Sequence, residues 1–317
     1  MNYEIGQLIF ESISKHRSSI MGIAVLSIMQ YHWISAFGIS NPGFLGVDVF
    51  LFLSGIGMVK SLGDNTMKIF FMHRFKRLFP TCFLCGLIKY TLFEIGLFSI
   101  PISAWTLTGL DLWYIRTILI FYVISPCLVR LCKSLRLFPI SCFLLCILFA
   151  VFFRENGDKD TIEKTLFGVL AWSIERFPVF LFGMIFAMNY QHFTNKELYL
   201  SALFLFLSFV IKGIDKMQIL SLDHILFLPL FALGLPALLF AILLILEKTY
   251  RGIYKILSHI GKISLELYLV HEYIFQNFLS FEHNKSSFIL FILACLLSYS
   301  LAMSSHWITK SIQILKR

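Results

Sequence analysis

Residues 225–246 have the sequence ILFLPLFALGLPALLFAILLIL, a run that contains no charged side chain. At about 1.5 Å per residue, a helix over this run is about 33 Å long, which matches the hydrocarbon thickness of a bilayer. Only a helix or a closed barrel satisfies its backbone hydrogen bonds in lipid, so an apolar run of this length predicts a transmembrane helix. This stretch therefore indicates an integral membrane protein.

Apolar runs of similar length recur along the chain and predict a polytopic, all-α fold. We interpret ten of them as membrane-spanning helices, at residues 19–38, 44–62, 78–98, 112–130, 137–153, 170–189, 198–214, 225–246, 262–281 and 287–308. No internal repeat and no Pro/Gly-rich linker divides the chain. We therefore expect a single transmembrane domain over residues 1–317, with no appended soluble domain.

The composition agrees with a membrane protein and argues against other classes. Hydrophobic residues make up 58% of the chain and charged residues only 14%, and the mean hydropathy is +0.81. A soluble domain carries about 25% charged residues, so this chain cannot cover a water-facing surface. The composition therefore argues against a soluble enzyme, a disordered protein and a nucleic-acid-binding module, and we expect no nucleic-acid partner. The net charge of +9 is explained by cytoplasmic loops, which collect Lys and Arg.

The seven cysteines do not indicate a disulfide framework or a metal site. Most of them lie in apolar runs, although Cys82 and Cys85 have the spacing of a redox or zinc pair. No second pair and no nearby histidine cluster completes such a site. We predict buried, small hydrophobic cysteines and no bound metal.

Basic residues concentrate in alternate loops, and this sets the expected orientation. The loops at 38–44 and 99–111 contain no Lys or Arg, whereas the loops after the second, fourth and eighth spans contain several each. The loop at 154–169 has mixed charge. Because basic loops stay in the cytoplasm, both termini are predicted to be cytoplasmic.

Segment 64–77, DNTMKIFFMHRFKR, is too polar to span the membrane. Its apolar residues Ile69, Phe70, Phe71 and Phe75 alternate with basic ones. One interpretation is an amphipathic helix on the cytoplasmic membrane surface. The other, which composition alone favours, is an ordinary basic loop.

Three ionisable residues are predicted at similar depth in the outer half of the membrane. His32 is in the first span, Asp48 is about four residues into the second, and Arg116 is about four residues into the fourth. An ionisable residue within a span is costly and indicates a functional site. We therefore treat His32 and Asp48 as candidate catalytic residues and Arg116 as a candidate substrate-binding residue.

This trio has a specific chemistry. A neutral His32 can take a proton from a hydroxyl nucleophile, and Asp48 can fix its tautomer and stabilise the imidazolium. Arg116 can stabilise a developing oxyanion or neutralise Asp48. The alternative is an Asp48–Arg116 ion pair that only locks helices together.

Three further polar pairs lie in or near predicted spans: Lys89 with Glu94, Glu175 with Arg176, and Glu266 with His271. Arg176 can line the same cavity as the trio, which makes it a candidate substrate-binding residue. Glu266 and His271 are expected to share a helix face. Each pair is nevertheless more typical of a structural role than of a catalytic one.

The ordered pattern of motifs resembles the acyltransferase 3 family of integral membrane O-acyltransferases. The similarity covers most of the chain and rests on six segments: IMQYHWIS (28–35), GVDVFLFLSGIGM (46–58), FMHRFKRLFP (71–80), LWYIRTILIFYVISP (112–126), RFPVFLFGMIFA (176–187) and IGKISLELYLVHEYIF (260–275). Each segment alone is a weak signal. Six of them in order, on a chain of ten predicted spans, are a specific one.

The resemblance implies a reaction and its partners. Family members transfer an acyl group, usually acetyl, from cytoplasmic acyl-CoA to a hydroxyl of a carbohydrate outside the bacterial cytoplasmic membrane. Acyl-CoA is then a co-substrate, no cofactor is bound, and the acceptor is a glycan such as an exopolysaccharide, capsule or O-antigen. His32 matches the catalytic histidine of the first span. Arg74 and Arg77 match the family's donor-side arginine motif, and guanidinium groups suit the phosphates of CoA.

One position departs from the family pattern. Members carry an Arg or Lys that ten residues separate from the histidine, and this chain has Met21 at that position. Arg17 lies one turn earlier and only about 40° away around the helix, since each residue turns an α-helix by about 100°. Arg17 can therefore extend along the same face and replace the missing basic residue. The alternative is that this basic group, and with it a contact to the donor, has been lost.

Two other functions stay open at this level. A transporter or flippase of a glycan or acylated small molecule also needs many spans and buried charges, but no pair of inverted repeats is evident. A non-catalytic scaffold in a polysaccharide assembly system is the other alternative, and it predicts that His32 can be replaced without effect. Another copy of the chain, forming a homo-oligomer, or polysaccharide-assembly proteins are candidate partners.

Overall fold

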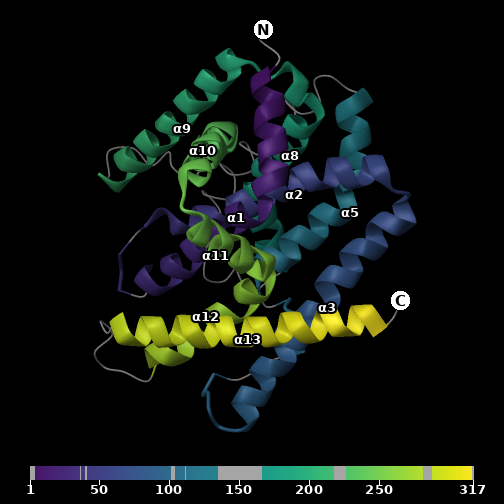
Figure 1. The fold of residues 1–317 in the computed structure, drawn as a ribbon. Coiled ribbons are helices and arrows are strands. Elements are labelled where there is room, and N and C mark those ends of the chain that lie inside the picture. The colour runs from purple at the N-terminus through teal and green to yellow at the C-terminus, as the bar shows by residue number, and fades with distance from the viewer. Residues whose placement is uncertain are drawn as a thin grey trace. The chain divides into compact units, whose positions relative to one another are not determined.

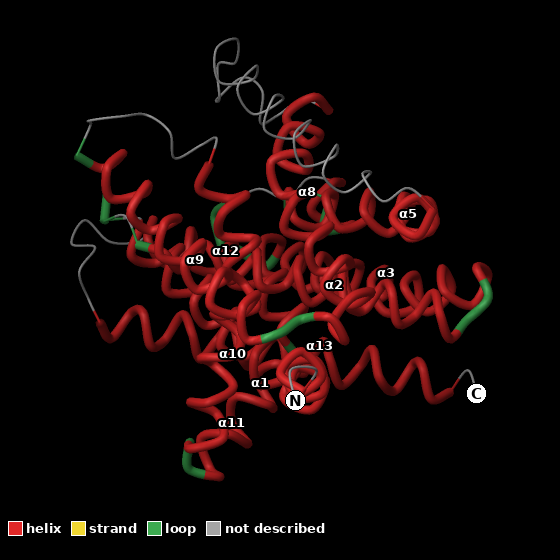
Figure 2. Tube along the Cα trace, turned by 90° about the horizontal axis from the view of Figure 1, so that it is seen from above, coloured by secondary structure: helices red, strands yellow, loops and turns green. Residues whose placement is uncertain are grey.

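The computed structural model describes residues 4–35, 37–39, 41–100, 104–110, 112–134, 166–217, 226–280 and 288–315. Within these ranges the chain forms helices joined by turns and short loops, and no strand occurs among them (Figure 2). The predicted all-α class is thus confirmed. The predicted span at 137–153 lies outside the described residues.

The described helices follow the order of the predicted spans. They are α1 (Glu4–Ser35), η1 (Pro42–Phe44), α2 (Leu45–Asp64), α3 (Met67–Glu94), α4 (Ala104–Thr108), α5 (Trp113–Ser134), α8 (Leu166–Asn189), η2 (Tyr190–His192), α9 (Asn195–Lys216), α10 (Leu228–Lys248), α11 (Arg251–Lys262), α12 (Ser264–Ser280) and α13 (Phe288–Leu315).

Five helical segments of the described chain are long and apolar enough to cross a membrane. These segments are Pro42–Asp64, Trp113–Ser134, Asn195–Lys216, Leu228–Lys248 and Phe291–Ser311. They make the chain a multi-pass membrane protein. The count of ten spans and the cytoplasmic position of the termini stay predictions.

Two helices begin well before the predicted spans. α1 starts at Glu4 rather than at residue 19, because Ile9 and Ile13 repeat at helical spacing and are buried. α3 starts at Met67 and thus includes residues 67–77, which agrees with the helical interpretation of the amphipathic segment rather than with a loop. Both helices therefore extend through charged segments, because apolar residues recur there at helical spacing.

The described contacts divide the chain into two compact units. The first comprises Met1–Arg17, Asp48–Phe70 and Arg116–Arg251, and the second comprises Ser18–Val47, Phe71–Ile115 and Gly252–Arg317. We describe each unit by itself.

In the first unit, α10 packs against α9 and α8 (Figure 1). Pro236 lies inside α10, where a proline has no N–H to donate and weakens the hydrogen bonds of the preceding turn. The buried Ser201 of α9 compensates for this: its hydroxyl donates to the Leu233 carbonyl at 2.7 Å and accepts from the Ala237 N–H at 3.2 Å. One side chain of α9 thus satisfies the opened helix turn of α10.

In the second unit, α12 and α13 lie side by side (Figure 1). The Ser18–Ser35 part of α1 contacts α11 backbone to backbone. A Cβ atom on Gly22 would lie 2.1 Å from the Leu257 carbonyl oxygen, and one on Gly261 would lie 1.6 Å from the Ser18 carbonyl oxygen. Only glycine allows this approach, which is typical of packed helices in membranes.

Candidate functional site

In the first unit, Asp48 forms an ion pair with Arg176. Asp48 lies in the first turn of α2 and is fully buried, and its Oδ2 accepts a hydrogen bond from the Nη1 of Arg176, which is also buried. The partner of Asp48 is therefore Arg176 of α8 and not Arg116. Its second oxygen, Oδ1, is buried and accepts no hydrogen bond within the described chain.

Two glycines let α2 and α8 come close enough for this pair. A Cβ atom on Gly55 would lie 2.3 Å from the Phe180 carbonyl oxygen, and one on Gly183 would lie 2.3 Å from the Phe52 carbonyl oxygen. The two helices therefore touch through their backbones. This contact explains why the SGIG stretch of the sequence carries small residues at this position.

Two further candidate substrate-binding residues, Arg17 and Arg116, also lie in the first unit. The guanidinium of Arg17 lies beside Gly57 of α2, because a Cβ atom on that glycine would be 3.4 Å from Nη2. Arg116 is half-buried in the first turn of α5. The adjacent Thr117 shares a 2.9 Å hydrogen bond with Ser173, which lies one turn before Arg176 on α8. The start of α5 is thereby tied to the part of α8 that carries Arg176.

In the second unit, His32 lies against a second imidazole. The ring centroids of His32 and His271 are 5.1 Å apart, with the ring planes at 65°. His32 is half-buried in the last turn of α1, whereas His271 of α12 is 1% exposed. His32 also has an edge contact with the ring of Tyr31, and no described group hydrogen-bonds to its nitrogens. Its imidazole is thus held by ring contacts alone in the described chain.

Glu266 and His271 do not share a helix face, contrary to the prediction. Glu266 accepts a hydrogen bond from Nδ1 of His306 on α13 at 2.8 Å, whereas His271 faces α1. Five residues turn an α-helix by about 500°, which leaves the two side chains about 140° apart around α12. Glu266 is 4% exposed, so this pair ties a buried carboxylate to a half-exposed histidine.

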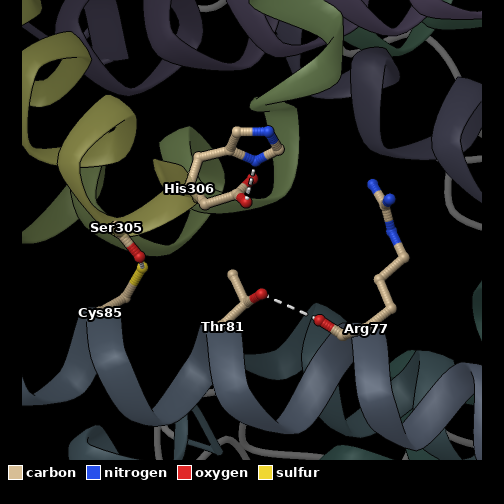
Figure 3. Close-up of polar contacts among 6 residues, drawn as sticks. Arg77, Thr81, Cys85, Ser305 and His306 are labelled. Atoms are coloured by element: carbon tan, nitrogen blue, oxygen red, sulfur yellow. Dashed lines mark hydrogen bonds and ion pairs between the residues drawn. The ribbon is translucent and has the colours of Figure 1, made fainter. Parts of the chain in front are cut away.

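The donor-side arginine Arg77 stands on a polar face of α3. The side chains of Arg77, Thr81 and Cys85 rise from the same face of this helix, toward the side where Ser305 and His306 of α13 lie (Figure 3). The Cys85 thiol and the Ser305 hydroxyl are 3.2 Å apart, and the Thr81 hydroxyl donates to the Arg77 carbonyl at 2.9 Å. Spacing by four residues brings these groups onto one stripe.

Exposure differs between the two donor-side arginines. The Arg77 guanidinium is exposed, and Arg74 is half-buried. Cys82 and Cys85 form no disulfide within the described chain and are buried, as predicted. Further along α3, the buried Lys89 has its ammonium 5.9 Å from the ring centre of Tyr273 on α12. Polar side chains of α3 therefore continue along the helix as far as Lys89.

Sequence reasoning found the polar residues but missed two pairings. His306 was not considered, because a single histidine near the end of a long apolar helix carries no motif. His271 was interpreted as structural, although it lies within the motif segment 260–275. Asp48 and His32 belong to different units, so the expected His–Asp dyad stays a prediction.

Among the described residues, no group of three or more His, Cys, Asp or Glu side chains is arranged to hold a metal ion.

Comparisons with known proteins give one match. No curated protein and no solved structure matches the chain. The family model described as an acyltransferase domain matches residues 20–307, which is nearly the whole chain. The matched range includes His32, the Arg74–Arg77 motif and His271, and on this ground the chain belongs to the acyltransferase 3 family of membrane acyltransferases.

Proposed function

We propose that this protein is an O-acyltransferase of the bacterial cytoplasmic membrane. It moves an acyl group, with acetyl as the first candidate, from cytoplasmic acyl-CoA to a hydroxyl of an extracytoplasmic glycan. The observation that carries the proposal is the membership of the acyltransferase 3 family together with a half-buried His32 on α1. No described group hydrogen-bonds to this imidazole, which suits a base that must meet a substrate hydroxyl.

The proposed step is a direct acyl transfer. A ring nitrogen of His32 takes the proton of the acceptor hydroxyl as its oxygen attacks the thioester carbonyl. The tetrahedral intermediate then expels the CoA thiolate as the carbon–sulfur bond breaks. The thiolate takes the proton from the His32 imidazolium, so the products are the glycan ester and CoA-SH. General-base help of this kind contributes about 10²- to 10⁴-fold in rate.

The donor is proposed to enter along α3. Arg77 is exposed and Arg74 half-buried on the helix that begins with the basic, amphipathic segment. A guanidinium binds phosphate in bidentate fashion, and the phosphates of CoA are the most charged part of the donor. Arg17, Arg116 and Arg176 are proposed as further substrate-binding residues, and the ion pair with Asp48 holds Arg176 in place.

The test uses inverted membrane vesicles that contain the full-length protein and its glycan acceptor. Radiolabelled acetyl-CoA is added outside the vesicles, and label in the glycan is measured. His32→Ala is expected to abolish transfer at an unchanged amount of membrane protein. His259→Ala is the matched control, since this histidine of α11 bonds the Tyr299 hydroxyl and lies outside the proposed machinery. Transfer that persists in His32→Ala would overturn the proposal.

A further inference from the structure

The tautomer of His271 is set by its own helix. Its Nδ1 lies 3.0 Å from the Leu267 carbonyl oxygen and 2.9 Å from the Tyr268 carbonyl oxygen. A carbonyl oxygen only accepts hydrogen bonds, so Nδ1 carries the hydrogen and donates it. In a neutral ring the other nitrogen, Nε2, is then an acceptor with a free lone pair.

This acceptor is buried without a protein partner. The His271 ring is 1% exposed, and its Nε2 makes no hydrogen bond within the described chain. Leaving such a group unpaired lowers stability, so a buried acceptor without a partner requires an explanation. A pure packing role does not supply one, because phenylalanine or leucine would fill the same space without this cost.

The group best placed to use this acceptor is the imidazole of His32. The ring centroids of the two histidines are 5.1 Å apart, so this unpaired acceptor and a ring that carries an N–H donor are neighbours, although no hydrogen bond joins them in the structure. The ring planes are tilted by 65°, which is an edge-to-face ring contact.

We propose that His271 is a positioning residue for the acyl transfer, and this rests on the function proposed above. During the reaction its Nε2 accepts the N–H of a reoriented His32 ring, which fixes the His32 tautomer and turns the other ring nitrogen toward the acceptor hydroxyl. When His32 becomes an imidazolium, the same hydrogen bond becomes charge-assisted and strengthens. His271 takes no proton itself, so the proton balance of the reaction is unchanged. The pair replaces the carboxylate of a His–Asp dyad with a neutral acceptor held by the α12 backbone.

Two amide substitutions separate the two nitrogens of His271. In His271→Asn the amide group occupies the place of Nδ1, so the anchor to the backbone is kept and the buried acceptor is lost. In His271→Gln the amide reaches the place of Nε2, so its oxygen can accept the His32 N–H and the anchor is lost. Both side chains are polar and smaller than or similar to histidine. Gln is closer to histidine in volume than Asn, so a packing role would lower the amount of folded protein in His271→Asn, whereas a positioning role lowers kcat per amount of folded protein.

The experiment measures kcat and KM for acetyl-CoA with both variants, the His32→Ala variant and the His259→Asn control. Rates are expressed per amount of folded protein extracted from the membrane. We expect His271→Asn to lose roughly 10- to 100-fold in kcat with an unchanged KM, which is the usual effect of removing a partner that orients a working imidazole. We expect His271→Gln to recover most of that loss and His259→Asn to match the wild type.

The outcomes separate this inference from the proposed function. If His32→Ala is inactive and His271→Asn matches the wild type, or falls no further than His271→Gln, the positioning role is wrong and the function stands. If His32→Ala is active, the proposed function fails, and the positioning role fails with it.

Discussion

Asp48 of α2 and Arg176 of α8 form a buried ion pair, with the Arg176 guanidinium donating to one oxygen of the carboxylate. Both side chains are buried, so little water can reach the pair. A buried ion pair gains little over apolar residues of the same size, but breaking it leaves one charge without compensation. The pair therefore makes the α2–α8 contact sensitive to single substitutions.

We predict that Asp48→Ala and Arg176→Ala each lower the free energy of unfolding by about 3–5 kcal/mol, because each removes one charge of a buried ion pair. The double variant Asp48→Leu with Arg176→Met is expected to recover most of this loss. Thermal or denaturant unfolding in detergent micelles measures both effects. Equal losses in the single and double variants would contradict a direct ion pair.

The same double variant tests the catalytic role predicted for Asp48. If Asp48 acts on the reaction, the double variant folds and stays inactive. If activity returns together with stability, Asp48 serves only the helix contact, and its sequence-based role is wrong.

A second prediction concerns Ser201, whose hydroxyl bridges the Leu233 carbonyl and the Ala237 N–H beside Pro236. Ser201→Ala should lower the free energy of unfolding by about 1–3 kcal/mol, since it leaves buried backbone groups unpaired. With Pro236→Ala already present, α10 can close its own hydrogen bonds, and the effect of Ser201→Ala should largely disappear. Unfolding of the four members of this double-mutant cycle measures the coupling. Ser208→Ala is the matched control, because the Ser208 hydroxyl donates to the Leu205 carbonyl of its own helix. Additive effects of the Ser201→Ala and Pro236→Ala substitutions on stability would show that Ser201 does not satisfy the helix turn opened by Pro236.

A third prediction concerns the donor side of α3. Arg77→Ala should raise the KM for acetyl-CoA roughly fivefold, which corresponds to about 1 kcal/mol for an exposed contact between charges. Arg77→Lys should recover only part of this, because an ammonium cannot bind phosphate in bidentate fashion. The kcat is expected to change little.

The adjacent Lys76 provides the control for this prediction. It is exposed and points about 100° away from Arg77 around the helix. Lys76→Ala should leave the KM close to that of the wild type. Equal rises in KM for the two alanine variants would mean that only the overall basic charge of the segment matters.

A fourth prediction concerns Arg17, whose guanidinium lies beside Gly57. If Arg17 replaces the basic residue that the family carries at the position of Met21, Arg17→Ala should lower kcat/KM for acetyl-CoA. Adding Met21→Arg should then restore it, since the two positions are only about 40° apart around α1. Steady-state kinetics in proteoliposomes measure both variants. Unchanged kinetics in Arg17→Ala would remove this residue from the mechanism.

Much of the fold followed from local properties of the sequence. Charge-free runs such as residues 225–246 predicted helices that the structure places at nearly the same bounds, Leu228–Lys248 in this case. Errors of extent occurred where amphipathic segments continue a helix, as at Glu4 and Met67. At both places the apolar residues recur at helical spacing, but the charged residues suggested that the helix does not extend that far.

The sequence by itself determined the helical class, the family and the polar residues worth testing, because hydropathy, residue spacing and motif order are all read along the chain. Only the tertiary structure decided that Asp48 pairs with Arg176, that Glu266 bonds His306 and that His271 faces His32. A side chain finds its partner through the angle at which its helix is turned and the neighbour against which that helix packs. Both are set by contacts between residues distant in sequence, such as the glycine contacts of α2 with α8 and of α1 with α11.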